Sequence, residues 1–241
     1  MPYRKEKFIN EGVYHIVLRA LDDNLIFKNI DDHYRGIFSI YEFNTTKAVI
    51  IRDRRKVRSH VKKILKKANR DPRFATDSRE KILEILAFCL MPNHIHLLVR
   101  QLREGGIIKF MRKFGAGYGG YFNKKYSRKG HVFQGNFKSV FIKNDEQLKV
   151  VWAYIHANPI SLVWPKWKER GIANFGKASK FLENYKWSSY LDYLGVANFP
   201  SVTGREFILE IIGDQSKCRE FLENYIKYKG RVKEFPALVL E

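Results

Sequence analysis

Two histidines stand one residue apart in the apolar stretch "CLMPNHIHLLVRQ", residues 89–101. Residues i and i+2 of a β-strand share a face and lie about 6.5 to 7 Å apart along the chain. His94 and His96 would therefore present two imidazoles side by side, and neutral imidazoles are good ligands for a divalent cation. The alternative is that one or both are hydrogen-bonded histidines beneath a helix, and the pattern alone leaves the two interpretations about evenly balanced.

A second candidate group lies in "QLKVVWAYIHANP", residues 147–159, which predicts a helix. The apolar residues at helical spacing form its buried stripe: Leu148, Val151, Trp152 and Ile155. Tyr154 and Asn158 are four residues apart and share one flank of that stripe, while His156 falls on the other flank. One helix edge thus presents a phenol and an amide oxygen that can bind a cation. Spacing alone does not distinguish this phenol from those of Tyr118, Tyr121 and Tyr126.

The elements that must position these groups follow from the hydrophobic pattern. β-Branched residues over 12–21 predict a strand, and Asp31 or Asp32 would cap a helix that runs roughly to Glu42. The segments "EKILEILAFCLM" and "HIHLLVRQ" predict an antiparallel hairpin that turns at Pro92-Asn93. The odd-numbered apolar residues of its second strand would pack on helices and leave the histidines on the opposite face.

Three further elements are predicted after the hairpin. Residues 105–130 indicate a basic, aromatic helix with glycine-rich interruptions, and 131–142 indicate a loop that enters a strand. Asn144 with Gln147 three residues later is typical of a helix start, and Pro159 ends that helix. After about residue 175 the chain changes to short helices separated by Gly and Pro, which predicts a C-terminal helical extension.

Charge is the unusual feature of the composition. The 241 residues include 45 Lys and Arg against 25 Asp and Glu, a net charge of +20, while 45% of residues are hydrophobic. This excess predicts a polyanionic partner, most often nucleic acid. No run of about 18 apolar residues and no signal-peptide pattern occurs, so no membrane partner and a cytoplasmic location are expected. Cys89 and Cys218 lack CxxC spacing, which fits a reducing compartment.

The strongest concentration of positive charge is "RDRRKVRSHVKKILKKANRDPRF", residues 52–74. Its apolar residues recur at helical spacing: Val57, Val61, Ile64, Leu65 and Ala68. Charge runs are usually solvated helix faces, but this face has almost no acids interspersed. We therefore favour contact with phosphate backbone over a purely solvated face.

Four segments, in this order and spacing, resemble a known family: "AFCLMPNHIHLLVR", "GHVFQGNFKS", "YIHANPI" and "WSSY". They are similar to the REP-associated tyrosine transposases, which belong to the single-tyrosine HUH transposases (His-hydrophobic-His), over most of residues 10–195. The resemblance implies an α+β, ferredoxin-like or Rep-like HUH domain, with a central antiparallel sheet and helices on one side. We expect that domain at residues 1–175, with a basic helical insertion at about 50–80, and the helical extension at 176–241.

The resemblance also implies the chemistry. The family cuts and rejoins single-stranded DNA, often at hairpin-forming repeats, through a 5′-phosphotyrosine. Its pattern places the metal ligands at His94, His96 and Asn158 and the nucleophile at Tyr154. The implied cofactor is a divalent metal, Mg²⁺ or Mn²⁺, and the implied partner is single-stranded or hairpin DNA. The resemblance does not determine the oligomeric state, which can be a monomer or a homodimer.

The predicted DNA-binding residues are basic side chains from three segments: Arg54, Arg55, Lys56, Arg58, Lys62, Lys63, Lys66, Lys67, Arg112, Lys113, Lys124, Lys125, Arg128 and Lys138. Four aromatic residues beside them either stack on exposed bases or belong to the core: Tyr118, Tyr121, Phe122 and Tyr126.

Three other functions compete with the transposase hypothesis. The first is a nucleic-acid-binding regulator on the same fold that does not catalyse. The second is a metal-dependent phosphodiesterase that uses water, in which Tyr154 is structural and no covalent adduct forms. The least favoured is a structural zinc site at the histidines, because no cysteine is placed to complete its ligands.

Overall fold

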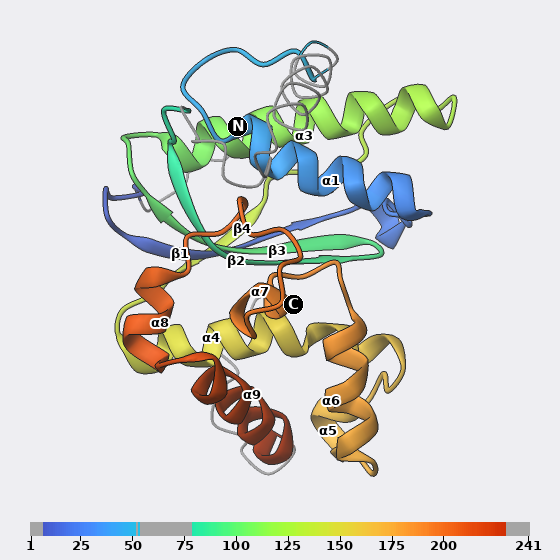
Figure 1. Ribbon diagram of the computed structural model, residues 1–241. Helices are drawn as coiled ribbons and strands as arrows, with labels where there is room; N and C mark the ends of the chain where they lie inside the picture. Colours follow the sequence, from blue (N-terminus) through green and yellow to red (C-terminus); the bar gives the residue numbers. More distant parts are fainter. Residues whose placement is uncertain (1–6, 52, 54–78, 230–241) are drawn as a thin grey trace, which may run out of the picture.

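The computed structural model describes residues 7–51, 53 and 79–229, and within them four strands form one antiparallel sheet in the order β2-β3-β1-β4 (Figure 1). The strands are β1 (Val13–Arg19), β2 (Leu83–Met91), β3 (His94–Gln101) and β4 (Lys138–Phe141). β2 and β3 form the predicted hairpin, and its turn consists of Pro92 and Asn93. β4 is the predicted strand after the loop.

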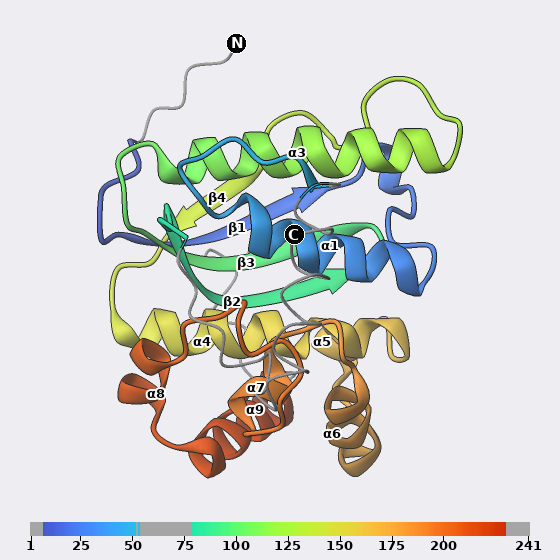
Figure 2. The same cartoon turned by 45° about the horizontal axis from the view of Figure 1, so that its top comes forward.

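Two helices cover one face of this sheet, α1 (Ile30–Phe43) and α3 (Gly106–Lys125) (Figure 2). The chain order β1-α1-β2-β3-α3-β4 is that of a ferredoxin-like unit. The predicted α+β class, its central antiparallel sheet and its flanking helices are therefore confirmed.

The opposite face is covered as well, so the expectation of helices on one side is wrong. α4 (Asp145–Ala157) lies across it, and the helices that follow pack around α4 (Figure 1). They are the 3₁₀ helix η3 (Asn158–Leu162), α5 (Trp167–Arg170), α6 (Phe175–Asn184), α7 (Tyr190–Tyr193), α8 (Glu206–Ile212) and α9 (Gln215–Lys229). They confirm the C-terminal helices, while the domain boundary near residue 175 stays a prediction.

Side chains of the sheet alternate between these two covered faces, as the pleat requires. On β3, the residues that pack toward α1 and α3 are Ile95, Leu97 and Val99. His96 and Leu98 face α4 instead. The predicted division of this strand into an apolar face and a histidine face is therefore correct.

α3 is one continuous helix of 20 residues, contrary to the predicted glycine-rich interruptions. Its glycines serve packing instead. A Cβ atom on Gly117 would overlap the ring of Phe43 in α1, so the missing side chain allows the two helices to approach closely. Gly120, by contrast, has nothing within 4 Å of the position that its Cβ would take.

The start of α1 also differs from the prediction. Its cap is Asn29, whose side-chain oxygen accepts a hydrogen bond from the Asp32 backbone N–H. Asp32 is the third helical residue and turns inward. The cap predicted for α4 is confirmed, because Asn144 Oδ1 accepts from the Gln147 N–H at 2.8 Å.

The outer edge of β2 is closed by a segment that follows α6. The backbone N–H of Leu90 donates to the carbonyl of Trp187 at 2.9 Å, and the N–H of Ser189 donates to the carbonyl of Phe88 at 3.0 Å. Cys89, fully buried in this strand, forms a β-bridge with Ser188. The C-terminal part of the chain thus contributes backbone hydrogen bonds to the sheet itself.

The basic segment at 52–74, with the helix predicted for it, lies outside the described residues except for Asp53. No helix within the described residues has the length and apolar character needed to span a membrane.

Two alanine substitutions in α3 are expected to have opposite effects on stability. Gly117→Ala pushes a methyl group into the Phe43 ring and should lower the free energy of unfolding by about 1–3 kcal/mol. Gly120→Ala meets open space within a helix and should raise it by roughly 0.5–1 kcal/mol. Urea unfolding of both variants checks this, and equal shifts would contradict the close approach of α1 and α3.

Candidate active site

His96 is the centre of a buried polar cluster on the α4 face of the sheet. Its Nδ1 shares a hydrogen bond with Nε2 of His15 at 3.0 Å, and its Nε2 lies 2.9 Å from Nδ2 of Asn158. His15 and His96 are 0% and 1% exposed, and Asn158 is 4% exposed. Both ring nitrogens of His96 therefore have defined partners, which fix the plane of the ring.

The register of β1 against β3 explains the His15 contact. Val17 is the direct partner of His96, and His15 is the partner of Leu98. His15 and His96 are therefore diagonal neighbours on one face of an antiparallel pair, within reach of long side chains. Asn158 arrives from the other side, because it follows α4 directly and caps that helix.

His94 lies at the start of β3, and its hydrogen-bond partner is the neighbouring residue Asn93. Its Nδ1 is 2.6 Å from Oδ1 of Asn93, and Nδ2 of Asn93 donates to Asp23 at 3.4 Å. A neutral His94 that donates from Nδ1 keeps the lone pair on Nε2. The centroids of the His94 and His96 rings are 4.7 Å apart, so the two predicted ligands are brought together.

Tyr154 joins this cluster from α4. Its ring centroid is 5.5 Å from that of His96 and 5.8 Å from that of His15, both in edge-to-face geometry. The Nζ atom of Lys168, in α5, lies 4.7 Å from the Tyr154 ring centroid. Tyr154 is only 2% exposed, so other side chains of the protein cover its ring.

Burial keeps the histidines of the cluster neutral. It lowers the pKa of His15 to about 3, and it lowers the pKa of His96 well below the ordinary value. Burial also lowers the pKa of His94 to about 4, with smaller contributions from the positive charges of Arg19 and Lys168. At neutral pH these imidazoles are uncharged, the form that binds metal ions.

The donors fit a divalent metal if the Asn158 amide binds through its oxygen. Nε2 of His96 and the amide group are 2.9 Å apart, close to the ~3 Å between adjacent ligands of an octahedral ion with ~2.1 Å bonds. Oxygen and nitrogen of an amide are exchanged by rotating it, so Oδ1 can take that place. No group of three His, Cys, Asp or Glu side chains that could hold a metal occurs within the described ranges.

The hydrogen bond between His15 and His96 has two possible directions. When the Asn158 amide nitrogen donates to His96 Nε2, Nδ1 of His96 must carry the proton and donate to His15. A metal on Nε2 would require this same tautomer, in which Nε2 of His15 accepts the hydrogen bond from Nδ1 of His96. His15 Nδ1 is buried, and no partner for it occurs among the described residues.

His156 lies apart from this cluster, as its place on the other flank of α4 predicted. Its Nε2 is 2.8 Å from the hydroxyl of Ser189, and its ring packs on Trp152 and Tyr190. Burial lowers its pKa to about 3. His156 therefore belongs to the core beneath α4.

The predicted DNA-binding residues divide into described and undescribed ones. Eight lie outside the described residues: Arg54, Arg55, Lys56, Arg58, Lys62, Lys63, Lys66 and Lys67. Arg112, Lys124 and Lys138 are exposed. Lys113 instead donates hydrogen bonds to the carbonyls of Thr45 and Lys47, so it holds that loop. Contact of these residues with DNA stays a prediction.

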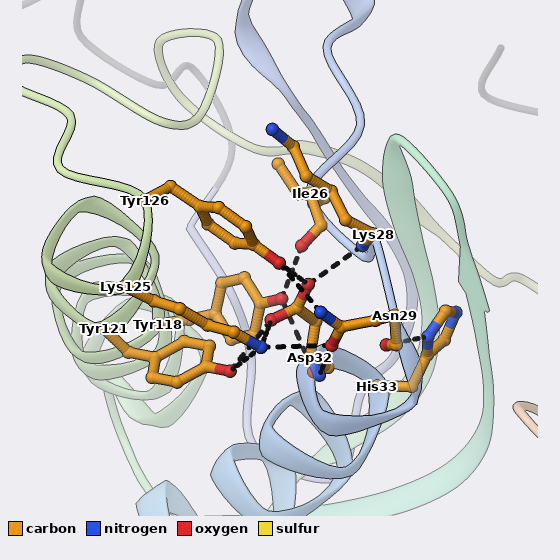
Figure 3. Close-up of polar contacts among 9 residues, drawn as sticks. All are labelled: Ile26, Lys28, Asn29, Asp32, His33, Tyr118, Tyr121, Lys125 and Tyr126. Atoms are coloured by element: carbon orange, nitrogen blue, oxygen red, sulfur yellow. Dashed lines mark hydrogen bonds and ion pairs between the residues drawn. The ribbon is translucent and has the colours of Figure 1, made fainter.

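The aromatic residues of α3 are mostly structural. Tyr118 and Phe122 are 0% and 1% exposed, so base stacking by these two is wrong. Tyr121 and Tyr126 are partly buried, and both hydroxyls donate to the carboxylate of Asp32, at 2.8 and 2.6 Å (Figure 3). The sequence places these two tyrosines near lysines, which is typical of a DNA-binding surface. It does not reveal that both hydroxyls bind Asp32 in α1.

Asp32 is the acceptor at the centre of this second cluster, shown in Figure 3. Its buried carboxylate also accepts from the Lys28 backbone N–H and pairs with Lys125 Nζ at 2.7 Å. Burial alone would raise the pKa of Asp32, but the bonds from Lys125, Tyr126, Tyr121 and Lys28 outweigh it and hold the pKa below its ordinary value. Lys125 therefore already has an anionic partner.

The Asp32 cluster also supports the turn that carries His94. Asp32 holds the backbone of Lys28, and the preceding residues Ile26 and Phe27 donate their N–H groups to the carbonyl of Pro92 at 2.8 and 3.1 Å. The ends of α1 and α3 are thereby connected to the β2–β3 turn. This cluster positions the histidine hairpin from the opposite face of the sheet.

Sequence reasoning missed two residues of the site. His15 carries a signal that could have found it, because it is a lone polar residue inside the apolar strand "VYHIVLR". Its placement beside His96 depends on the β1–β3 register, which the sequence does not give. Lys168 carries no such signal, since it is one of many surface cations and reaches Tyr154 only through the path of η3 and α5.

Comparisons with known proteins agree with the family resemblance. Residues 39–158 match the family described as "Transposase IS200 like", and this range contains His94, His96, Tyr154 and Asn158. The chain belongs to the IS200-like transposase family. No curated protein matches it.

Two solved structures are similar to this chain. One is a REP-associated tyrosine transposase bound to a REP hairpin, with 14% identity, coverage of 86% of this chain and 93% of the other, and a TM-score of 0.46. The second is described as a transposase from Deinococcus radiodurans R1, with 11% identity, coverage of 62% and 92%, and a TM-score of 0.32.

Asp32→Asn is expected to lower the free energy of unfolding by about 3 kcal/mol at pH 7, because it removes one partner of a buried ion pair. Asp31→Asn, at the exposed neighbouring position, should change it by less than about 0.5 kcal/mol. Since folding lowers the pKa of Asp32, the wild-type advantage is present above about pH 4 and shrinks as pH falls through the lowered pKa. Urea unfolding at pH 7 and pH 3 measures both effects.

Proposed function

We propose that this protein is a metal-dependent transesterase that cleaves and rejoins single-stranded DNA through a 5′-phosphotyrosine on Tyr154. One observation carries the proposal: Tyr154 and Asn158, from α4 and its C-cap, meet the histidine pair of β3 at His96. Membership in the IS200-like transposase family supports the reaction class. The REP hairpin in one similar structure makes hairpin-forming DNA the first substrate to test.

In this reaction the metal ligands and the nucleophile are different side chains. His94, His96 and Asn158 would hold Mg²⁺ or Mn²⁺, which supplies Lewis-acid polarisation of the scissile phosphate when bound. The phenol oxygen of Tyr154 loses its proton to solvent and attacks phosphorus, a new P–O bond forms to Tyr154, and the bond to the 3′ oxygen of the DNA breaks, so that this oxygen takes up a proton from solvent and leaves as a 3′-OH. The same or another 3′-OH can later attack the phosphotyrosine and restore the DNA without a nucleotide cofactor.

Lys168 and Arg19 complete the electrostatic environment. Lys168 lies beside the Tyr154 ring, and Arg19 is the strand partner of His94. Positive charges at these positions stabilise the negative charge that develops on the phosphate oxygens during attack. His15 acts through His96, as a positioning residue that holds its ring and tautomer.

The decisive experiment mixes the protein with labelled single-stranded hairpin DNAs and Mn²⁺ or Mg²⁺ and separates products on a denaturing gel. We expect a metal-dependent band of DNA bound covalently to protein. Tyr154→Phe removes the nucleophilic oxygen and should abolish that band, and His94→Ala should reduce it at least 100-fold. Tyr190→Phe, a buried tyrosine that packs beside His156, is the matched control and should retain it.

Each competing function has its own result in this assay. Cleavage without an adduct, or an adduct that persists in Tyr154→Phe, would show that water or another residue is the nucleophile. Tight binding without cleavage of any hairpin would favour the regulator.

His15→Leu tests the positioning role. Loss of the bond to His96 Nδ1 should weaken Mn²⁺ binding and adduct formation by about 10- to 100-fold. His156→Leu is the control, because it also removes a buried histidine but lies on the other flank of α4. Calorimetric titration with Mn²⁺ and thermal unfolding separate the two effects, and equal losses in both variants would refute a specific role for His15.

A further inference from the structure

An aromatic groove lies away from the histidine cluster, between α1 and the loop that follows α7. The cavity has a volume of about 320 Å³, within the range of small-molecule sites. α1 and the 199–202 loop each provide four lining residues: Tyr34, Ile37, Phe38, Tyr41, Phe199, Pro200, Ser201 and Val202. We call this cavity the aromatic groove.

Tyr34 is the exposed ring of this groove. It is 45% exposed. Its ring meets the edge of Trp187 at a centroid distance of 5.2 Å. Trp187 in turn stacks on His33 at 4.4 Å and on Phe199 at 6.4 Å. The exposed ring is therefore held in place before any ligand arrives, which reduces the entropy lost on binding.

Cations lie at two positions beside this groove. Lys186 Nζ is 5.0 Å from the centroid of Tyr34 and 4.7 Å from that of Trp187, and it donates a hydrogen bond to the Tyr34 hydroxyl at 3.2 Å. The guanidinium of Arg79 lies 3.3 Å from the centroid of Tyr41. None of the eight lining residues is acidic. The groove therefore suits a ligand that is both planar and anionic.

The groove and the active site share one structural unit. The carbonyl of Trp187 accepts from Leu90 in β2, and β2 leads directly into the turn before His94. On the other side, the His33 ring packs on Phe27, whose N–H donates to Pro92 in the same turn. These contacts connect the walls of the groove to the hairpin that carries the predicted metal ligands.

We propose that the aromatic groove binds an unpaired base of single-stranded DNA, with Tyr34 as the stacking ring and Lys186 and Arg79 near the adjoining phosphates. This inference rests on the proposed function, because it assigns a second contact to the same substrate. Stacking between bases and aromatic rings beside a positive surface is the usual means of holding single strands. An apolar peptide would fill the cavity without using either cation.

The test measures the affinity of the full-length protein for a dye-labelled oligothymidylate by fluorescence anisotropy at fixed salt, without divalent metal. Tyr34→Ala should raise Kd about fivefold or more. Tyr34→Phe retains the ring and should bind within about twofold of wild type. Tyr228→Ala is the matched control, because Tyr228 is 46% exposed with Lys227 near its ring, but lies in α9 outside the groove.

An oligomer of the same length that lacks every base separates stacking from charge. It should bind wild type more weakly than oligothymidylate, and Tyr34→Ala should weaken it no further. The proposal is overturned if Tyr34→Ala and Tyr228→Ala have the same effect, or if the loss in Tyr34→Ala persists on the abasic oligomer. It is also overturned if no variant changes affinity, as expected for a groove that binds a protein.

Failure of this inference and failure of the proposed function give different results. The anisotropy assay involves no cleavage, so Tyr154→Phe should show the same Tyr34 dependence as wild type. If the Tyr34→Ala variant binds oligothymidylate as tightly as wild type and still forms the covalent adduct on the gel, only the groove assignment is wrong. If the groove binds bases but no adduct forms with any hairpin, only the proposed chemistry is wrong.

Discussion

The antiparallel pairing of β1 with β3 is the constraint on which the rest of the site depends. Both faces of the sheet are covered, so every side chain of these strands must enter one of two cores. The pairing of Val17 with His96 places His15 and His96 on the α4 face together. A shift of one residue would send His15 to the face of α1 and α3. The register therefore determines which polar groups can meet Tyr154.

Desolvation then gives the cluster its chemical character. A buried imidazole loses the water that stabilises its charged form, so these histidines are neutral and each ring nitrogen is either a donor or an acceptor. The hydrogen bonds that His96 and His94 donate from Nδ1 to His15 and Asn93 select their tautomers. The Asp32 cluster works by the opposite principle, since an ionised carboxylate is kept in the interior by several donors. Burial keeps the first cluster neutral, whereas the second is ionised and supports the turn before His94.

The sequence was sufficient where a feature depends on local spacing. The alternation in "HIHLLVR" predicted the two faces of β3, and the helical spacing of Tyr154, Asn158 and His156 predicted which flank of α4 each occupies. Prediction from the sequence failed where the environment of a residue is formed by segments that are distant in the chain. The glycines of α3 suggested breaks because Phe43, which fills the space beside Gly117, is far away in the chain. The sequence also did not reveal that the hydroxyls of Tyr121 and Tyr126 donate to Asp32, because Asp32 lies on another helix.

The segment at 187–189 gives the sheet a property that its four strands do not have by themselves. An edge strand normally presents free backbone groups that can recruit a strand from another molecule. Here Phe88 and Leu90 already exchange hydrogen bonds with Ser189 and Trp187, which lie beyond the predicted end of the catalytic domain. A chain shortened at residue 175 would keep every predicted catalytic residue, but the backbone groups of Phe88 and Leu90 at the edge of β2 would be left unpaired. The C-terminal part of the chain thus closes the β2 edge of the sheet as well as covering its α4 face.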